Sequence, residues 1–251
     1  ADGSLDTTFD PGTGPNAGVL SLVVHADGKV LLGGYFSAVN GAARYRVARL
    51  NSDGSVDAAF VPGTWDNGYV NHVSLANDGK VLLAGNLYVG FNNRLLRLNA
   101  DGSRDTGFNV GNNLISADVT AAVAQGDGKV LIGGYFTSIN GATRNGVARL
   151  HANGTLDPAF DPGAGANNIV WTLLLQPDGL LVAGGAFTTY QGVSRNYLTR
   201  IHNDSINQAP LMDAFTSLTV LEDSGLANVA VTGIAPGPAS ESGQTVTNVT
   251  A

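Results

Sequence analysis

The sequence predicts an all-β protein built from one repeated unit, and three observations lead to this expectation. Glycine is frequent, with 34 copies in 251 residues, whereas charged residues make up only 13%. A hairpin motif centred on Asp-Gly recurs along the chain. Phenylalanines after each motif mark a period of about 50 residues, which is the spacing of propeller blades. We therefore expect short strands joined by tight turns, in the arrangement of a β-propeller.

The clearest copy of the hairpin motif is residues 49–60, RLNSDGSVDAAF. Its turn lies at Asp53-Gly54, and its return strand ends at Phe60. Asp-Gly between two alternating segments favours a tight turn, because glycine accepts a positive φ without steric cost. The motif is repeated at residues 97–108 and 149–160, with its second half alone at 2–9 and its first half alone at 200–203.

Each repeat is expected to contain four strands. In the first repeat these are Ser4–Phe9, Val19–His25, Lys29–Phe36 and Tyr45–Asn51. The second and third are apolar nearly throughout, as expected of strands that are buried on both faces. Four-stranded units at this period predict a propeller of four visible blades over residues 1–202.

The two half-hairpins predict how the propeller closes. Ser4–Phe9 lacks a partner strand, and Tyr197–His202 ends the fourth blade without a return strand. Folds generally remove such unpaired edges, so we expect these segments to pair and to set Arg200 against Asp6. If upstream repeats exist, Ser4–Phe9 would pair with them instead, and the ring would be open or completed by another chain.

The hairpin register also predicts a repeated ion pair. A three-residue loop at 52–54 sets Arg49 opposite Asp57. Opposite charges on facing residues stabilise a hairpin by roughly 0.2–1 kcal/mol. An anion site lined by the repeated arginines is the functional alternative. The same hairpin register pairs Arg97 with Asp105 and Arg149 with Asp157.

Oxygen-bearing side chains alternate through these turns, which is a feature of calcium loops. However, glycine is fourth rather than sixth in the loop, and ordinary turn chemistry explains Asp-Gly equally well. We therefore expect no cofactor, with calcium as the alternative. The weak calcium candidates are Asp53, Asp57, Asp101 and Asp105.

Composition excludes several classes of protein. The net charge of -7 provides no basic face for nucleic acid, and no apolar run approaches the length of a membrane helix. Cysteine is absent, so disulfides and thiolate metal sites are excluded. Residues 1–202 contain no glutamate, and neither HExxH nor G-x-S-x-G occurs. We expect a protein that is not an enzyme.

The long loops offer a candidate binding surface. In a propeller, the loop that leads into a blade and the loop that joins its middle strands emerge on one face, which we call the long-loop face. The repeat is least faithful there, and aromatic rings beside amides and carboxylates suit carbohydrate or peptide ligands. Ordinary loop variability is the alternative explanation. The candidate residues are Trp65, Asp66, Tyr69, Tyr88, Asn92, Asn113, Asp118 and Tyr190.

The repeated pattern resembles a known family. DGS-x-D-x-x-F-x-PG, then DGK-x-L-x-GG-x-F, then NG and R-x-x-V-A-RL, is similar to the bacterial delta-sixty repeat, a propeller-type repeat of large surface or secreted proteins. The resemblance covers Asp2 to Ile201, and it implies a propeller fold in an extracellular or cell-surface setting, with no catalytic residues. The departures are Asn86-Leu87-Tyr88 in place of an aromatic followed by Phe, Val110 in place of Pro, and Leu180 in place of Lys.

The remainder of the chain departs from the repeat. Residues 203–210 are predicted to be a linker. Residues 211–251 resemble the opening strands of an immunoglobulin-like or cadherin-like module, but such a sandwich needs about 100 residues. We expect either a truncated, partial β-sandwich-like domain or a segment that completes its sheet elsewhere.

The sequence thus predicts a non-catalytic extracellular or cell-surface module for binding, adhesion or assembly. Its expected partners are a carbohydrate or protein ligand on the long-loop face, and further copies or tandem neighbouring modules through the tail. The alternative is a secreted carbohydrate-active enzyme that uses Asp residues on the long-loop face. A pocket with two close carboxylates would favour the enzyme.

Overall fold

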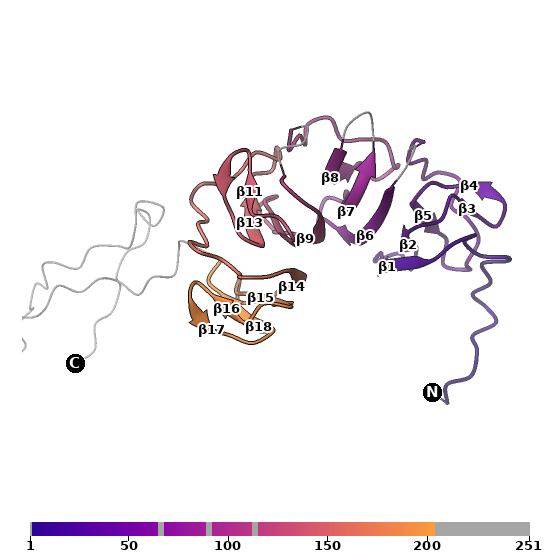
Figure 1. Ribbon diagram of the computed structural model, residues 1–251. Helices are drawn as coiled ribbons and strands as arrows, with labels where there is room; N and C mark the ends of the chain where they lie inside the picture. The colour runs from indigo at the N-terminus through magenta and orange to yellow at the C-terminus, as the bar shows by residue number, and fades with distance from the viewer. Residues whose placement is uncertain (1, 65–67, 89–91, 112–114, 204–251) are drawn as a thin grey trace, which may run out of the picture. The chain divides into compact units, whose positions relative to one another are not determined.

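The computed structural model describes residues 2–64, 68–88, 92–111 and 115–203 (Figure 1). The chain divides into two compact units, Ala1–Ile201 and His202–Ala251, and every described strand belongs to the first. Within the described residues there are strands but no helix, which confirms the predicted all-β class. The predicted module at residues 211–251 and all of the linker except Asn203 lie outside the described residues.

Four three-stranded antiparallel sheets follow one another along the chain, and we number them repeats 1 to 4 (Figure 1). In each sheet the second strand along the chain lies between the first and the third, so every repeat is a simple meander. We call the first, second and third strands of a repeat its inner, middle and outer strands. The strands are β1 (Val19–Val24), β2 (Val30–Gly34) and β5 (Val47–Leu50); β6 (Gly68–Leu75), β7 (Val81–Tyr88) and β8 (Asn92–Leu98); β9 (Val119–Ala124), β10 (Val130–Gly134) and β13 (Val147–Leu150); and β14 (Val170–Leu175), β15 (Leu181–Gly185) and β18 (Leu198–Ile201).

Repeats 1, 3 and 4 carry a small additional hairpin between their middle and outer strands. In repeat 1 its turn is Asn40-Gly41, with φ values of 47° and 74°, which is the type I′ geometry that suits Asn-Gly. Asn16 joins this hairpin to the preceding long loop, because its Oδ1 accepts hydrogen bonds from the backbone N–H groups of Ser37 and Ala38. The small hairpins are β3 (Ala38–Val39) with β4 (Ala42–Ala43), β11 (Ser138–Ile139) with β12 (Ala142–Thr143), and β16 (Thr189–Tyr190) with β17 (Val193–Ser194).

The predicted four-stranded blades are wrong for the described residues, because each sheet has three strands and the return segments form only isolated bridges. The return segment of repeat 1 makes a single bridge, between Leu50 and Val56, and Asp57 N–H donates to the carbonyl of Arg49. The chain then turns, since Phe60 N–H donates to the carbonyl of Asp57 and the Phe60 ring enters the core. The register is as expected, but this turn ends the pairing before a strand can form.

Each hairpin turn also binds the preceding return segment. Asp10 N–H donates to the carbonyl of Asp53 at 2.8 Å, and the same bond joins Val61 to Asp101. Gly54, with φ of 90°, lies so close that an added Cβ would stand 2.6 Å from the carbonyl carbon of Asp10. The turn therefore needs glycine both for its backbone conformation and for this close approach.

The cores lie between successive repeats. We call the side of a sheet that packs on the following repeat its downstream face, and the opposite side its upstream face. A glycine pair that recurs in repeats 1, 3 and 4 permits the approach: a Cβ on Gly33 would lie 2.6 Å from Cγ1 of Val70. Between repeats 1 and 2, Leu31 and Val47 of the downstream face pack with Val70 and Val73 of the upstream face. Between repeats 2 and 3, the corresponding residues are Leu82 and Ala84 with Val119 and Ala122. Between repeats 3 and 4, they are Leu131 and Val147 with Val170 and Leu173.

Ring closure is not observed. Ser4–Phe9 forms no strand, and Asp6 accepts hydrogen bonds from the N–H and hydroxyl of Thr8. Among the described residues, Asp6 and Arg200 form no ion pair and β18 pairs with β15 alone. The strand predicted at Ser4–Phe9 is therefore wrong for this structure, because a return segment obtains its bridge only from an adjoining outer strand.

Candidate functional site

Three ion pairs of the predicted register recur along the described chain. Each joins the Nε of an outer-strand arginine to the Oδ2 of the facing aspartate. A lysine next to the Asp-Gly turn of the same repeat approaches the same carboxylate. The distances are 2.7 Å for Arg49–Asp57, 2.7 Å for Arg97–Asp105 and 2.8 Å for Arg149–Asp157, with Lys29, Lys80 and Lys129 at 2.9, 3.1 and 3.3 Å.

These pairs are integrated into the scaffold. Burial alone would raise the pKa of Asp57, but hydrogen bonds from Lys29, Arg49 and the N–H of Ala59 lower it to about 2. The Arg49 guanidinium lies 4.8 Å from the centre of the Phe60 ring and also donates to a carbonyl of the next repeat. Because these charged groups already satisfy one another, the arrangement favours the structural interpretation over an open anion site.

The calcium candidates also make local contacts. Oδ1 of Asp53 accepts hydrogen bonds from the N–H and hydroxyl of Ser55 at 2.9 and 2.6 Å, and Asp101 does the same with Ser103. In the described ranges, no group of three or more His, Asp or Glu side chains is arranged to hold a metal ion. That the protein works without a cofactor remains a prediction.

The structure brings together two of the predicted binding residues, Tyr69 and Asp118. The hydroxyl of Tyr69 donates to Oδ2 of Asp118 at 2.8 Å. Nη1 of Arg94 donates to Oδ1 of Asp118 at 2.5 Å and to Oδ1 of Asn86 at 2.6 Å. The ring of Tyr35 lies 5.2 Å from that of Tyr69, at an interplanar angle of 46°. We call these five residues the tyrosine–aspartate cluster.

Four of the five cluster residues, all except Arg94, occupy two recurring positions at the long-loop end of three successive repeats. The first position lies at the start of the inner strand, and the second directly follows the glycine pair of the middle strand. Backbone hydrogen bonding couples the two positions, as where Tyr35 N–H donates to the Gly18 carbonyl. The first position differs in every repeat, and the second is tyrosine in repeats 1 and 3 and differs in repeats 2 and 4. The pairs are Gly18 and Tyr35, Tyr69 and Asn86, Asp118 and Tyr135, and Ile169 and Ala186.

Repeat 2 contributes most to the cluster, because its local structure differs. Its long loop is replaced by an extended hairpin of β7 and β8, which has no small hairpin. Asn86 and Arg94 are brought to the long-loop end by these longer strands. Neither residue was predicted to belong to a binding site, although the departure from the repeat at 86–88 was an available signal.

The cluster combines an accessible ring with fixed hydrogen-bonding groups. Tyr35 is 47% exposed, and the side chains of Arg94 and Asp118 are partly exposed. Burial raises the pKa of Tyr69 to about 12, and its hydrogen bond to Asp118 acts in the same direction, so Tyr69 remains a neutral donor. A ligand would meet an aromatic platform beside a carboxylate and a guanidinium.

The other candidate residues are placed differently. Tyr190 is only 6% exposed and belongs to the core between repeats 3 and 4, so its ring is not part of an accessible face. Tyr88 and Asn92 pair at the ends of β7 and β8. Trp65, Asp66 and Asn113 lie outside the described residues.

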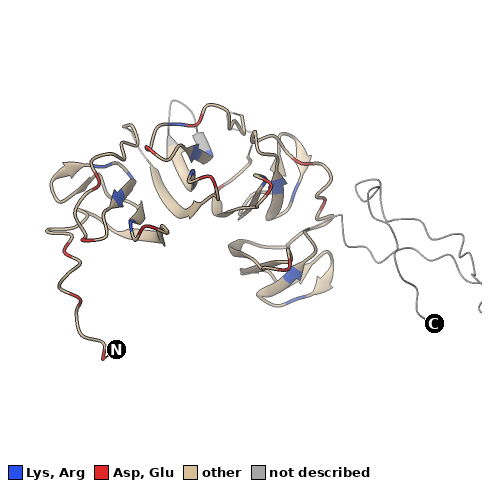
Figure 2. Ribbon diagram, turned by 180° about the vertical axis from the view of Figure 1, so that it is seen from behind, with Lys and Arg blue, Asp and Glu red and all other residues tan. Residues whose placement is uncertain are grey.

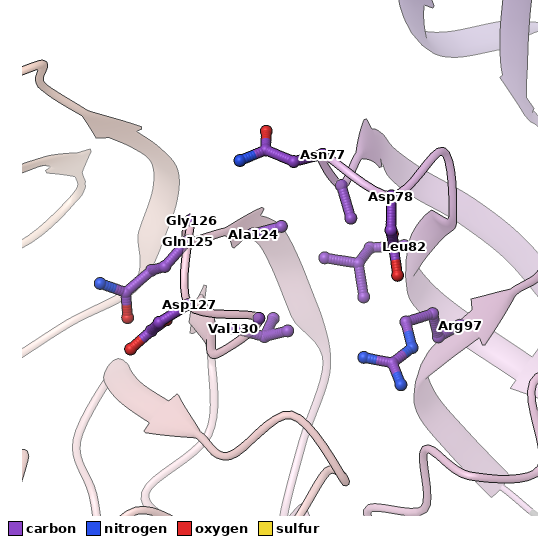
Figure 3. A pocket seen from close by; sticks show the side chains of 11 residues that line it. Asn77, Asp78, Leu82, Arg97, Ala124, Gln125, Gly126, Asp127 and Val130 are labelled. Atoms are coloured by element: carbon purple, nitrogen blue, oxygen red, sulfur yellow. The ribbon is translucent and has the colours of Figure 1, made fainter.

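Two cavities accompany the junctions of repeat 3. One, of about 260 Å³, lies between repeats 2 and 3 at their Asp-Gly turns (Figure 3). Figure 3 shows Arg97 on one side of it and Gln125 and Asp127 on the other, and the buried Oε1 of Gln125 has no hydrogen-bond partner. The second, of about 190 Å³, lies between repeats 3 and 4 and is lined by Tyr135 and Asn167, among others.

Acidic and basic residues occur in every repeat. In Figure 2, each sheet carries a basic segment on a strand, and the acidic segments lie mostly in the connecting loops and turns. The arginines of the three repeated ion pairs lie on β5, β8 and β13. Within the described ranges, no helix is long and apolar enough to cross a membrane.

The repeats identify the class of protein. Residues 25–60, 76–108, 125–160 and 176–205 match the family described as "Domain of unknown function (DUF5122) beta-propeller". The matched residues are more than half of the sequence, so the chain belongs to this family. The expectation of propeller-type repeats is confirmed.

Two solved structures are similar to the chain. The extracellular domain assigned to a one-component system, BT4673 from B. thetaiotaomicron, is 16% identical with a TM-score of 0.47, over 80% of this chain and 24% of that chain. The extracellular domain assigned to a hybrid two-component system, also BT4673, is 16% identical with a TM-score of 0.48, over 78% and 23%. This chain therefore spans about a quarter of the length of each. No curated protein matches it.

Proposed function

We propose that this protein is a non-catalytic, extracellular or cell-surface binding module, and that the tyrosine–aspartate cluster is its ligand-binding surface. The observation that carries the proposal is the convergence of Tyr35, Tyr69 and Asp118 from three successive repeats. Scaffold residues recur in each repeat, whereas a single binding site needs its residues once. Tyr69, Asn86 and Asp118 have no counterpart at the same position of another repeat, and Tyr35 recurs only as Tyr135.

The chemistry of the cluster favours a carbohydrate ligand. Sugar rings present C–H groups that stack on tyrosine and hydroxyl groups that need directional partners. Asp118 can accept hydrogen bonds from such hydroxyls, and Arg94 can donate them. A peptide with an aromatic side chain is the alternative ligand, because it would use the same groups.

The carboxyl chemistry of the cluster supports binding over catalysis. Hydrolysis of glycosidic bonds generally uses a pair of carboxyl groups on either side of the bond. The cluster as defined contains one carboxylate, Asp118, and its two oxygens already accept hydrogen bonds from Tyr69 and Arg94.

The proposal is tested by glycan-array binding with the full chain, followed by calorimetric titration of the retained sugars. We expect Tyr35→Ala and Asp118→Asn each to weaken binding about tenfold or more, because each removes stacking or a charge-assisted hydrogen bond. Tyr197→Ala is the matched control, since Tyr197 is an exposed tyrosine of repeat 4. Retention of no glycan, or equal binding by all variants, would refute the proposal. Cleavage of the retained sugar would instead support an enzyme.

A further inference from the structure

The cavity between repeats 2 and 3 has walls of two kinds. Figure 3 shows Ala124 and Val130 of repeat 3 facing Arg97 of repeat 2 across it. The cavity lies beside the Asp-Gly turns, whereas Tyr69 lies at the opposite end of β6. It is therefore separate from the tyrosine–aspartate cluster.

Small residues at two recurring positions leave room for this cavity. Ala124 pairs with the first residue of the middle strand, as Leu75 and Leu175 do in repeats 2 and 4. These two leucines pack against the cores of their own junctions, whereas Ala124 presents only a methyl group. On the opposite wall, Ala76 holds the position that Gln125 holds in repeat 3. The other repeats thus carry larger side chains where this junction carries alanine.

The Arg97 guanidinium has free hydrogen-bonding capacity at the cavity. Its Nε donates to Oδ2 of Asp105 at 2.7 Å. The equivalent Arg49 also uses Nη1, which donates to the Ala100 carbonyl of the next repeat at 2.7 Å. Among the described residues, the Nη groups of Arg97 have no hydrogen-bond acceptor, although the side chain is only 11% exposed. Two such groups on one guanidinium can bind a carboxylate through both of its oxygens.

An aspartate on the same wall provides the opposite charge. Asp78 lines the cavity, and Figure 3 shows its carboxylate directed toward Arg97. In the part of the chain that the structure describes, Asp78 pairs with Lys80 at 3.6 Å but not with Arg97. Asp127, the other carboxylate of the lining, lies on the opposite wall and is about half exposed (Figure 3). A ligand that reaches both Arg97 and Asp78 would need an anionic and a cationic group close together.

We propose that this cavity binds a free α-amino acid with an apolar side chain, such as leucine or phenylalanine. The ligand carboxylate accepts hydrogen bonds from the Nη groups of Arg97, and its ammonium group donates to Asp78. Its side chain packs against Leu82, Ala124 and Val130, which line the cavity.

Both the size and the charge of the cavity suit such a ligand. An apolar cavity of about 150 Å³ already holds benzene, and this cavity has a volume of about 260 Å³. A carboxylate without an amino group would be repelled by Asp78, and an amine without a carboxylate would be repelled by Arg97. The site therefore selects for a molecule that carries both charges.

Isothermal titration calorimetry of the full chain with L-leucine and L-phenylalanine tests the proposal. We expect leucinamide, which lacks the carboxylate, and N-acetyl-leucine, which lacks the ammonium group, each to bind about tenfold or more weakly than leucine. Failure of both amino acids to bind would overturn the proposal. Equal binding of either derivative would also overturn it, because one of the two charges would then make no contact.

A variant that fills the cavity provides a second test. Ala124→Leu introduces the residue that repeats 2 and 4 carry at this position, so the variant should fold and lose amino-acid binding. Ala58→Leu, at an exposed alanine of repeat 1, is the control and should bind like the wild type. Circular dichroism melts check that both variants are folded. Undiminished binding by Ala124→Leu would show that the ligand lies elsewhere.

The contact with the ammonium group is tested separately. Asp78→Asn should weaken leucine binding about tenfold or more, because it removes the charge but keeps an acceptor for the turn. Asp178→Asn, at the equivalent turn of repeat 4, is the matched control and should leave binding unchanged. Equal binding by Asp78→Asn and the wild type would overturn the assignment of an amino acid.

Discussion

Arg49 and Asp57 face each other across the first complete hairpin, with Nε 2.7 Å from Oδ2, and Lys29 approaches the same oxygen. The carboxylate is almost fully buried, so it depends on both cations. The pair holds the return segment against the outer strand where only one backbone bridge is formed. The ion pair thus does part of what a fourth strand would do.

Asp57→Ala should destabilise the protein by roughly 3 kcal/mol, because it leaves two partly buried cations without their partner. Urea denaturation monitored by circular dichroism measures this free energy of unfolding. Asp53→Asn is the control, since Asn can accept the same turn hydrogen bonds, and it should cost less than about 1 kcal/mol. Equal stability of the two variants would contradict a structural role for the ion pair.

Acid should unfold the protein within a defined pH window. The pKa of Asp57 is about 2 in the folded state, below its ordinary value of 3.8, and the pKa values of Asp105 and Asp157 are also lowered. A carboxyl whose pKa is lower in the folded state than in the unfolded state stabilises the folded protein at pH values above the unfolded-state pKa. This contribution is lost as the pH falls from the unfolded-state pKa through the folded-state pKa. For Asp57 the loss amounts to about 2 kcal/mol between roughly pH 4 and pH 2.

The stability difference between the wild type and Asp57→Asn, measured in urea from pH 6 to pH 2, tests this window. It should stay constant down to about pH 4 and narrow below it, because the wild-type carboxyl then becomes neutral as well. A difference that stays constant to pH 2 would show that the folded-state pKa is not the cause.

Gly54→Val should destabilise the protein by several kcal/mol, because valine resists a positive φ and its Cβ would collide with the backbone of Asp10. Gly41→Val is the matched control: its φ is also positive, but an added Cβ would meet nothing within 4 Å. We expect the control to cost only about 1–3 kcal/mol. Thermal unfolding of both variants separates strain from collision, and equal losses would argue against the inter-repeat contact.

Chelation should leave the melting temperature unchanged within about a degree or two, because a metal bound only by the folded state would stabilise it. Differential scanning fluorimetry with EDTA, and then with added calcium, measures this. A large decrease that calcium reverses would revive the calcium interpretation of Asp53, Asp57, Asp101 and Asp105.

The sequence by itself determined the repeat, the turn at Asp53-Gly54 and the register that sets Arg49 opposite Asp57. These features depend on residues within one hairpin, where turn geometry fixes which side chains face each other. The shortness of the return segment escaped prediction, because the turn that follows Asp57 depends on Phe60 entering a core shared with the next repeat.

Only the tertiary structure decided the candidate site and which apolar residues of the described strands are exposed. Tyr69 and Asp118 are 49 residues apart and meet because the inner strands of neighbouring repeats pack side by side. Whether Leu22 and Leu198 are buried depends in the same way on which sheet lies against them, since both are exposed whereas Val73 and Val47 at the equivalent positions are buried. Local sequence determines the strands and their turns, whereas burial and site geometry are properties of the junctions between repeats.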